Sequence, residues 1–434
     1  MTPDVLRAPA EAADVIPGGA HTYSKGDDQF SSNAPRYLER GEASLVWDDT
    51  GRCFLDWGMG LRTMSLGYRV KPVIEAAIDQ MWAGSNFTRP SRIESETAQD
   101  IIDLIPSVDM VKFAKNGSSV TSAAVKLARA FTGRTMIAIC SDHPFYSYDD
   151  WFISTTPCDG GIPSDVKQFT GSFRYNDRAS VDALFAEHGG QLAGLIMEAA
   201  TTDEPQQGFL NYVREKCRAN GTLFILDEMI TGFRWHLQGA QTYFDLDPDL
   251  STFGKGIANG FSVSALAGRR EIMELGGLRH DKKRVFLIST THGAENHALA
   301  ACRATLKIFR DDPVIEHMWS IGAALINGIN AAAADLGLSE YVRAIGYPCG
   351  PAITFKDNDG RASMPFRTLF LQEMVERGVI INYIAPSYSH RAADVEQTVA
   401  AVREALAVYA LALESGVEKY LVGPVVKPVF RPYN

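Results

Sequence analysis

The segment Leu223-Phe224-Ile225-Leu226-Asp227-Glu228 joins four apolar residues to two carboxylates. A short apolar run with polar residues at its end is typical of a buried β-strand. A second segment follows, Ser251-Thr252-Phe253-Gly254-Lys255-Gly256, in which Lys255 lies 28 residues after Asp227. The sequence therefore predicts a carboxylate at the end of a strand and a lysine on a turn of small residues.

Short apolar runs alternate with helical patterns from about residue 98 to residue 310. The expected strands are Met136–Cys140, Leu192–Met197, Leu223–Leu226 and Val263–Ala267, and the expected helices are Thr121–Phe131 and Val213–Ala219. This alternation predicts an α/β fold with a mostly parallel sheet covered on both faces. Ligands of such sheets bind at the carboxyl ends of the strands.

The two ends of the chain have a different pattern. It predicts a hairpin over 45–57, helices over 316–337 and 395–414, and strands near 352–355 and 379–383. A chain of 434 residues is also too long for one ordinary core. We therefore expect a large domain of residues 56–315 and a smaller α+β domain, to which residues 1–55 and 316–434 contribute.

The composition is that of a soluble globular protein, with 46% hydrophobic and 22% charged residues. The net charge of −10 argues against a nucleic-acid partner, because nucleic acids favour basic surfaces. The six cysteines include no C-x-x-C pair, as expected for reduced thiols. No apolar run reaches the roughly 18 residues of a membrane span, and the N-terminal residues do not resemble a secretory signal. We expect a cytoplasmic enzyme that does not bind a membrane.

Lys255 and Asp227 are the two kinds of residue that pyridoxal 5'-phosphate (PLP) requires. A lysine amine forms an imine with the cofactor aldehyde, and a carboxylate pairs with the protonated ring nitrogen. Each residue also has an ordinary alternative, since Asp227 can be a helix cap after a strand and Lys255 a solvated surface residue. The combination of residues 223–234 with Phe253-Gly254-Lys255-Gly256 is much more specific than either residue alone. We therefore predict a PLP enzyme with catalytic Lys255 and Asp227.

Two further segments fit this cofactor. Asn116-Gly117-Ser118-Ser119 precedes the helix expected at Thr121, and a helix N-terminus with hydroxyls and a glycine is an anion site suited to a phosphate. Its alternative is a simple N-cap. The aromatic segment 145–151 can supply a ring that stacks on a pyridine ring, or it can be part of the core.

The chain resembles the class III aminotransferases of fold type I, most closely the branch that contains glutamate-1-semialdehyde 2,1-aminomutase. The resemblance runs from Pro17-Gly18-Gly19 to Ala385-Pro386-Ser387. It implies a mostly parallel seven-stranded sheet flanked by helices, with Lys255 as the Schiff-base lysine and Asp227 as the partner of the ring nitrogen. The other cofactor contacts that it implies are Asn116, Gly117 and Ser118 at the phosphate, Phe145 and Met229 against the ring, and the acidic Glu198 near the ring.

The same resemblance implies a homodimer. Thr291, in Ser289-Thr290-Thr291-His292-Gly293, matches a threonine that reaches the phosphate of the neighbouring subunit's cofactor.

Some positions depart from the aminomutase. Lys25 replaces an arginine for the substrate carboxylate, and Leu61, followed by Arg62, replaces an aromatic residue. Arg89 and Arg92 lie where the aminomutase is neutral or acidic, and His390 takes the place of a glutamate. These changes argue against glutamate-1-semialdehyde as the substrate.

The candidate substrate-binding residues are therefore Lys25, Arg62, Arg89, Arg92 and His390. If the cations converge, the substrate carries a carboxylate or phosphate, which suits the arginine fork; the alternative is a set of solvated or ion-paired side chains. A histidine such as His390 is more often a structural hydrogen-bonding residue, and no metal-ligand spacing occurs. Glu295 fits either a pocket acid or the start of a helix.

Three functions remain open at this point. The first is an aminotransferase that acts on an acidic aldehyde or ketone, such as an oxo-sugar or sugar-acid derivative, with glutamate or another amino acid as donor. The second is an intramolecular 2,1-aminomutase, which needs no separate donor and releases no keto acid. The third is a non-catalytic cofactor-binding protein, against which the presence of both Lys255 and Asp227 argues.

Overall fold

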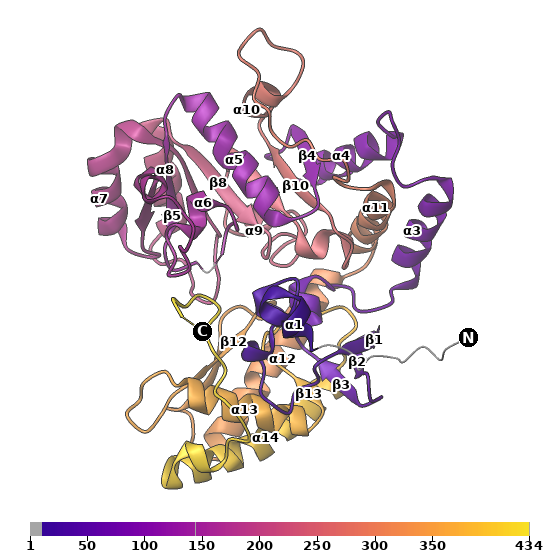
Figure 1. Cartoon of the computed structure of the whole chain (residues 1–434), viewed down its shortest axis with the longest axis vertical. Helices are drawn as coiled ribbons and strands as arrows, with labels where there is room; N and C mark the ends of the chain where they lie inside the picture. Colours follow the sequence, from indigo (N-terminus) through magenta and orange to yellow (C-terminus); the bar gives the residue numbers. More distant parts are fainter. Residues whose placement is uncertain (1–10, 144, 434) are drawn as a thin grey trace.

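A seven-stranded sheet forms the centre of the larger of two lobes in the computed structural model of the chain, which describes residues 11–143 and 145–433 (Figure 1). The strand order is β4-β10-β9-β8-β7-β5-β6. The strands are β4 Met110–Ala114, β5 Met136–Cys140, β6 Thr170–Phe173, β7 Leu192–Met197, β8 Leu223–Glu228, β9 Leu250–Phe253 and β10 Ser264–Gly268. Only β10 runs antiparallel to its neighbours in this sheet. The predicted mostly parallel seven-stranded sheet is confirmed.

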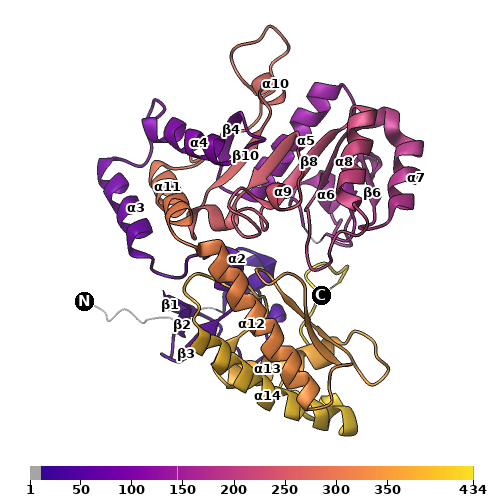
Figure 2. The ribbon, with the colours of Figure 1, turned by 180° about the vertical axis from the view of Figure 1, so that it is seen from behind.

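Helices cover both faces of this sheet, with α5 on one face and α7 and α8 on the other (Figures 1 and 2). The helices of this lobe are α3 Lys71–Ala83, α4 Arg92–Leu104, α5 Gly117–Thr132, α6 Asp150–Ile153, α7 Arg178–His188, α8 Phe209–Asn220, α9 Ala240–Tyr243, α10 Arg270–Met273 and α11 Asn296–Asp311. Successive strand residues point to opposite faces. Accordingly, Ile225 of β8 packs in the cluster that contains Val120 of α5, whereas Phe224 and Leu226 pack with Val213 of α8.

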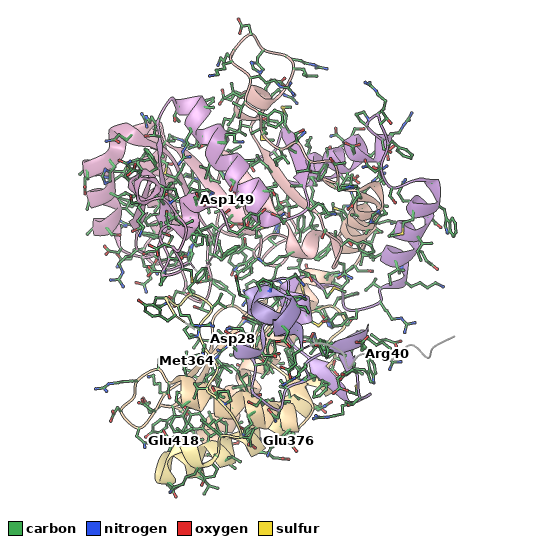
Figure 3. All side chains as sticks on the ribbon, in the orientation of Figure 1. Asp28, Arg40, Asp149, Met364, Glu376 and Glu418 are labelled. Carbon is green, nitrogen blue, oxygen red and sulfur yellow. The ribbon has the colours of Figure 1, made fainter. Side chains whose placement is uncertain are left out.

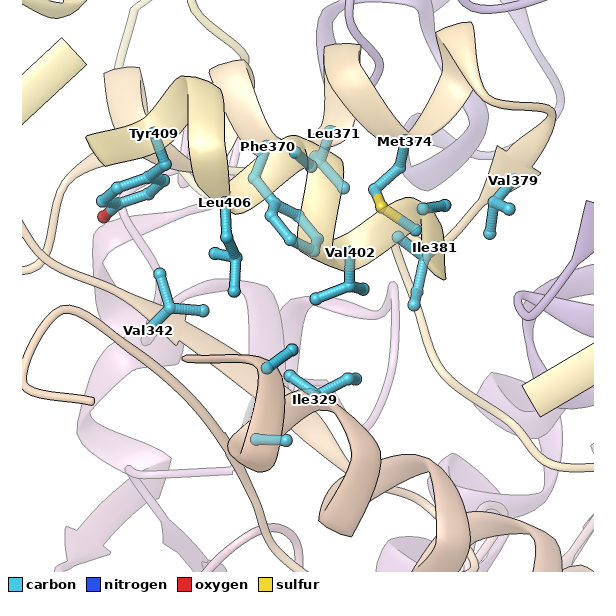
Figure 4. Packing of buried hydrophobic residues seen from close by; sticks show 14 of the residues in the cluster. Ile329, Val342, Phe370, Leu371, Met374, Val379, Ile381, Val402, Leu406 and Tyr409 are labelled. Atoms are coloured by element: carbon cyan, nitrogen blue, oxygen red, sulfur yellow. The ribbon is translucent and has the colours of Figure 1, made fainter. Parts of the chain in front are cut away.

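The smaller lobe combines both ends of the chain. Its sheet has the order β1-β2-β3-β13, and β13 pairs in parallel with β3 at Val379↔Leu55. Its elements are β1 Leu38–Glu42, β2 Leu45–Asp48, β3 Cys53–Asp56, β11 Val342–Ile345, β12 Ala352–Phe355, β13 Val379–Ile380, α12 Val314–Asp335, α13 Met364–Glu376 and α14 Ala392–Ser415. Figure 4 shows its core, in which Val402 and Leu406 of α14 pack with Phe370 of α13 and Ile329 of α12. The domain limits at residues 55 and 315 stay a prediction.

Most predicted elements match these bounds, and one is shorter. The strand expected over 379–383 is limited to Val379–Ile380. Beyond it the chain stays beside β3 through separate bonds, because Trp57 N donates to Ile380 O (2.9 Å) and Ala385 N donates to Trp57 O (2.8 Å). No helix among the described residues has both the length and the apolar character needed to span a membrane.

Candidate active site

Asp227 and Lys255 lie at the carboxyl ends of two adjacent parallel strands. Asp227 is opposite Thr252 in the register of β8 and β9, and Lys255 follows β9 after a single glycine. The carboxylate of Asp227 is buried, and its Oδ1 accepts hydrogen bonds from Met229 N (2.9 Å) and Thr252 Oγ1 (3.1 Å). Burial lowers the pKa of the half-buried Lys255 amine, and the charge of Asp227 opposes that shift. The two predicted catalytic residues are thus brought together.

Strand geometry separates Asp227 from the neighbouring Glu228. Because consecutive strand residues point to opposite faces, Glu228 turns away from Lys255 and accepts from Ala240 N and Gln241 N (both 2.9 Å) and from Thr231 Oγ1 (2.5 Å). Its carboxylate organises the chain after β8. In contrast, no described residue donates a hydrogen bond to Oδ2 of Asp227, which leaves that oxygen for an N–H group of a bound ring.

Glu198 is a third buried acid beside this pair. It follows β7, and burial, assisted by the negative charge of Asp227, raises the pKa of its carboxyl to about 8. Lys255 and Arg62 act in the opposite direction on the same carboxyl. The residues are therefore close enough for their charges to interact, and they form a mixed-charge site at the strand ends.

Arg62 reaches this site from a strained turn. Met59, Gly60, Leu61 and Arg62 all have positive φ angles between 45° and 70°, and such a conformation costs on the order of 1–3 kcal/mol for each non-glycine residue. Asp56 supports the turn by accepting from Gly58 N (2.7 Å) and from the Tyr68 hydroxyl (2.6 Å). Burial lowers the pKa of the Arg62 guanidinium, while Glu198 raises it.

The predicted phosphate turn begins α5. Asn116 is its N-cap, and its side chain accepts from Ser119 N at 3.0 Å, so the capping alternative holds for this side chain. Gly117 and Ser118 are the first helical residues, and N–H groups in a first helical turn lack partners within the helix. Ser118 Oγ accepts from Tyr148 N (3.0 Å). Capping and anion binding are therefore compatible here.

Two glycines make room for Met229. A Cβ atom on Gly117 would lie 3.0 Å from Met229 Sδ, and one on Gly254 would lie 2.6 Å from the same sulfur. The apolar side chain is held between the turn before α5 and the turn that carries Lys255. The residues present thus fit PLP: free N–H groups for its phosphate, Met229 against the ring, and an available oxygen of Asp227 for the ring nitrogen.

The aromatic segment is attached to the same helix N-terminus. Thr121 Oγ1 donates to Tyr146 O (2.9 Å), and the Tyr146 hydroxyl lies 2.8 Å from His143 Nδ1. Phe145 is 45% exposed, and its ring contacts Phe152 edge-on and Phe430 in a stacked arrangement. Tyr146 is part of the core, which was the alternative to a ring that stacks on the cofactor. Phe145 faces outward.

Three of the predicted cations lie on the surface. Lys25, Arg89 and Arg92 are exposed, and none of their side chains forms a hydrogen bond or ion pair with another described residue. Thr291 is also exposed, and its carbonyl accepts from Asn86 Nδ2 (3.0 Å) in the segment that contains Arg89. Of the five candidate substrate residues, only Arg62 lies near Lys255 and Asp227 within a single chain.

His390 has a different environment from the one proposed for it. It is fully buried, stacks on Trp57 with ring centroids 4.1 Å apart, and lies 2.8 Å from the Ser387 hydroxyl through Nδ1. Burial lowers its pKa to about 3. This placement favours the structural alternative, so we leave His390 out of the proposed substrate site.

Two features were not assigned from the sequence. Arg234 is buried and donates to Cys349 O, Pro386 O and Ser65 Oγ, all at 3.0 Å, which joins segments of both lobes. Its only sequence signal is its position in the block that follows Asp227. Glu295, left undecided, is the N-cap residue of α11 and pairs with Lys115 at 2.9 Å. Among the described residues, no three His, Cys, Asp or Glu side chains gather to hold a metal ion.

Comparison with known proteins agrees with this geometry. The model of the family described as Aminotransferase class-III matches residues 28–406. The chain belongs to the class III aminotransferases. Members of this family use PLP, and PLP is the cofactor that the site fits.

Relatives within the class III aminotransferases have more than one activity. The chain is 30% identical to glutamate-1-semialdehyde 2,1-aminomutase of Desulfitobacterium hafniense (92% of this chain and 96% of the relative). It is also 30% identical to 3-aminobutyryl-CoA aminotransferase of Cloacimonas acidaminovorans (92% and 95%). Among solved structures, the FumI protein of Sphingopyxis sp. MTA144, in its PLP internal aldimine form, is 27% identical with a TM-score of 0.84 (93% and 96%).

Glu198→Gln is expected to change how the stability of the cofactor-free protein depends on pH. The raised pKa means that folded Glu198 keeps its proton up to about pH 8, whereas the unfolded carboxyl loses it near its ordinary value. Relative to the variant, which stays neutral, the wild type is most stable below the unfolded pKa and loses stability as pH rises towards the folded pKa. The two proteins should therefore have similar Tm values at low pH, and the Tm of the wild type should fall progressively below that of the variant from pH 5 to pH 9. Thermal unfolding measures it, with the exposed Glu187→Gln as control; a difference independent of pH would contradict the assignment.

Proposed function

We propose that this class III aminotransferase moves an amino group from an amino acid donor, such as glutamate, to an aldehyde or ketone that carries an acidic group. An oxo-sugar or sugar-acid derivative is the acceptor class that we favour. The family provides the cofactor chemistry, and two relatives with different activities leave the substrate open. The choice of acceptor class therefore depends on the residues around Lys255.

Arg62 is the observation that carries the proposal. It is half-buried and interacts electrostatically with Glu198 and Lys255, yet no described carboxylate forms an ion pair with it. A buried guanidinium without an ionic partner is costly, and a carboxylate or phosphate of a substrate supplies that partner in bidentate geometry. The strained turn at 59–62 supports the same role, because strain of this kind concentrates at functional sites.

Five residues divide the work of amino transfer. PLP, when bound, supplies an electrophilic carbon and a ring that withdraws electrons. The Lys255 amine, whose pKa burial lowers, is uncharged more readily than a surface lysine and so can take up the proton of the substrate Cα–H and release it again. Asp227 holds a proton at the ring nitrogen, and Arg62 orients the acidic group of the substrate. The N–H groups of Gly117 and Ser118 bind the phosphate.

Intramolecular 2,1-amino transfer is the alternative. It is supported by the relatives that carry that activity. It is disfavoured by the departures at Lys25, Leu61 and Arg62, since the aminomutase has other residues there.

We also propose a homodimer in which Thr291 contributes to the neighbouring site. Its support is that Thr291 is exposed in the single chain, beside the equally exposed segment of Arg89 and Arg92. Sedimentation analysis tests it; a monomer at working concentration would contradict it.

A half-reaction tests the activity. The PLP-loaded enzyme is mixed with single amino acids and with amino sugars, while its visible spectrum and the release of keto acid are followed. An aminotransferase converts to the amine form with a donor alone and releases one keto acid per site. An aminomutase makes product without a separate donor. A protein that none of the tested amines converts to the amine form would contradict both proposed activities.

Arg62→Ala is expected to raise KM for the acidic carbonyl acceptor by about 10- to 100-fold, because a hydrogen bond to a charged group contributes about 1.5–3 kcal/mol. Arg62→Lys should recover part of this loss, since it keeps the charge but not the fork. The exposed Arg310→Ala is the matched control. Unchanged KM for every acidic acceptor that the wild type uses would remove Arg62 from the substrate site.

A further inference from the structure

The C-terminal residues 421–433, which we call the strap, connect the two lobes. The strap follows a short turn at Val417–Lys419 and lies beyond residue 406, where the match to the family ends. On the small lobe, Val422 N donates to Gln372 Oε1 (2.9 Å) and Val426 N donates to Thr368 Oγ1 (3.0 Å). In both views the strap ends between the lobes (Figures 1 and 2). The strap is therefore a part of the fold that lies outside the residues matched by the family.

The far end of the strap packs on the aromatic segment beside the cofactor site. The Phe430 ring lies 6.4 Å from that of Phe145, stacked at 22°, and 6.3 Å edge-on from that of Phe152. Cys158 Sγ donates to Arg431 O (3.3 Å) on the same lobe. Because Phe152 and Phe430 are the only rings of the described residues in contact with Phe145, the strap supplies half of the aromatic support of that side chain.

Phe145 is linked to the catalytic residues through its own segment. Tyr148 N donates to Ser118 Oγ (3.0 Å) at the phosphate turn. On the other side, Glu198 N donates to His143 Nδ1 (3.2 Å). Phe145 therefore lies in a segment that contacts both Ser118 and Glu198.

The strap also holds the N-terminal segment that carries Lys25. Lys427 N donates to Asp28 O (2.9 Å), and Arg431 forms an ion pair with the Asp28 carboxylate (2.6 Å). Asp28 lies at the boundary between the lobes (Figure 3). Next to it, Gln29 O accepts from Asn382 Nδ2 (2.8 Å), and the neighbouring Tyr383 lies close enough to Arg62 for an electrostatic interaction. The strap thus contacts both the aromatic segment and the N-terminal segment.

We propose that the strap positions Phe145 and the Lys25 segment relative to the cofactor site, and that Phe430 is a positioning residue for cofactor retention and for acceptor binding. The acceptor part rests on the proposed function; the cofactor part does not. The competing explanation is that the strap is a tether that only stabilises the fold. In that case the Phe430 variants would have a lower Tm but an unchanged Kd for PLP.

Release of PLP tests the cofactor part without any amine. Phe430→Ala should raise the Kd for PLP by about 2- to 10-fold, the value of one aromatic pair. Phe430→Leu, which keeps apolar volume, should give a smaller increase. Tyr433→Ala is the control, because Tyr433 is an 85% exposed aromatic residue of the same strap. Fluorescence titration of the cofactor-free proteins with PLP measures Kd, and thermal unfolding of the same samples measures stability.

A lower Tm with wild-type Kd in both Phe430 variants would overturn the proposal in favour of a simple tether. With an acceptor found by the half-reaction screen, Phe430→Ala should raise KM by about 3- to 10-fold with a smaller change in kcat; unchanged KM would overturn the acceptor part. A wild type that binds PLP but reacts with no amine contradicts the proposed function, and the PLP titration still decides whether the strap acts on the cofactor.

Discussion

Lys255→Ala is expected to lower the rate of amino transfer by at least about 10⁴-fold, because the variant loses both the covalent attachment point and the proton carrier. Lys255 is the described lysine whose amine interacts with both Asp227 and Glu198. Steady-state assays and single-turnover spectra measure the loss. The fold should persist, since Lys255 forms no hydrogen bond or ion pair within the described residues.

The exposed Lys419→Ala is the matched control and should retain wild-type rates. PLP should still bind Lys255→Ala, because the phosphate turn, Met229 and Asp227 remain, but its spectrum should be that of the free aldehyde. Transamination at near wild-type rate in a folded Lys255→Ala protein would contradict the account.

Asp227→Asn is expected to lower kcat by about 10²- to 10³-fold, the usual effect of removing one preorganised electrostatic group. The amide can still accept from Met229 N and Thr252 Oγ1, so the geometry is kept while the negative charge is lost. Rapid-mixing measurement of the half-reaction determines the loss directly. The loss should appear in the proton-transfer step rather than in substrate affinity.

Glu228→Gln provides the comparison on the same strand. Its two oxygens accept separately from Ala240 N and Gln241 N, so the NH2 group of the amide would face one of these donors and leave it without an acceptor. An unsatisfied buried group costs about 1–3 kcal/mol, and a lower Tm with largely retained kcat is expected. If Asp227→Asn kept kcat while Glu228→Gln lost it, the roles of the two carboxylates would be reversed.

The central strands were predictable because their sequences are continuous apolar runs. Leu192–Met197 and Met136–Cys140 are buried along their full length, which short apolar runs indicate well. The strand Leu250–Phe253 was not predicted, because it includes Ser251 and Thr252. Thr252 is tolerated in the core because its hydroxyl donates to Asp227, a contact between residues 25 positions apart.

The difference between local patterns and long-range contacts also explains which site residues could be predicted. Asp227 follows from local sequence because it ends a predicted apolar strand, and Lys255 because it lies on a turn of small residues. Arg234, His390 and the strap depend on contacts across long sequence separations, such as Arg234 with Pro386 and Phe430 with Phe145. No local pattern distinguishes a histidine stacked on Trp57 from one that faces a substrate.

The most direct test of the central claim is to locate the lysine that bonds PLP. The PLP-loaded enzyme is treated with borohydride, which makes the bond between lysine and cofactor permanent, and is then digested and analysed by peptide mass spectrometry. We predict a single pyridoxyl group on the peptide that contains Lys255. A pyridoxyl group on another lysine, or none on a protein that retains PLP, would contradict the account.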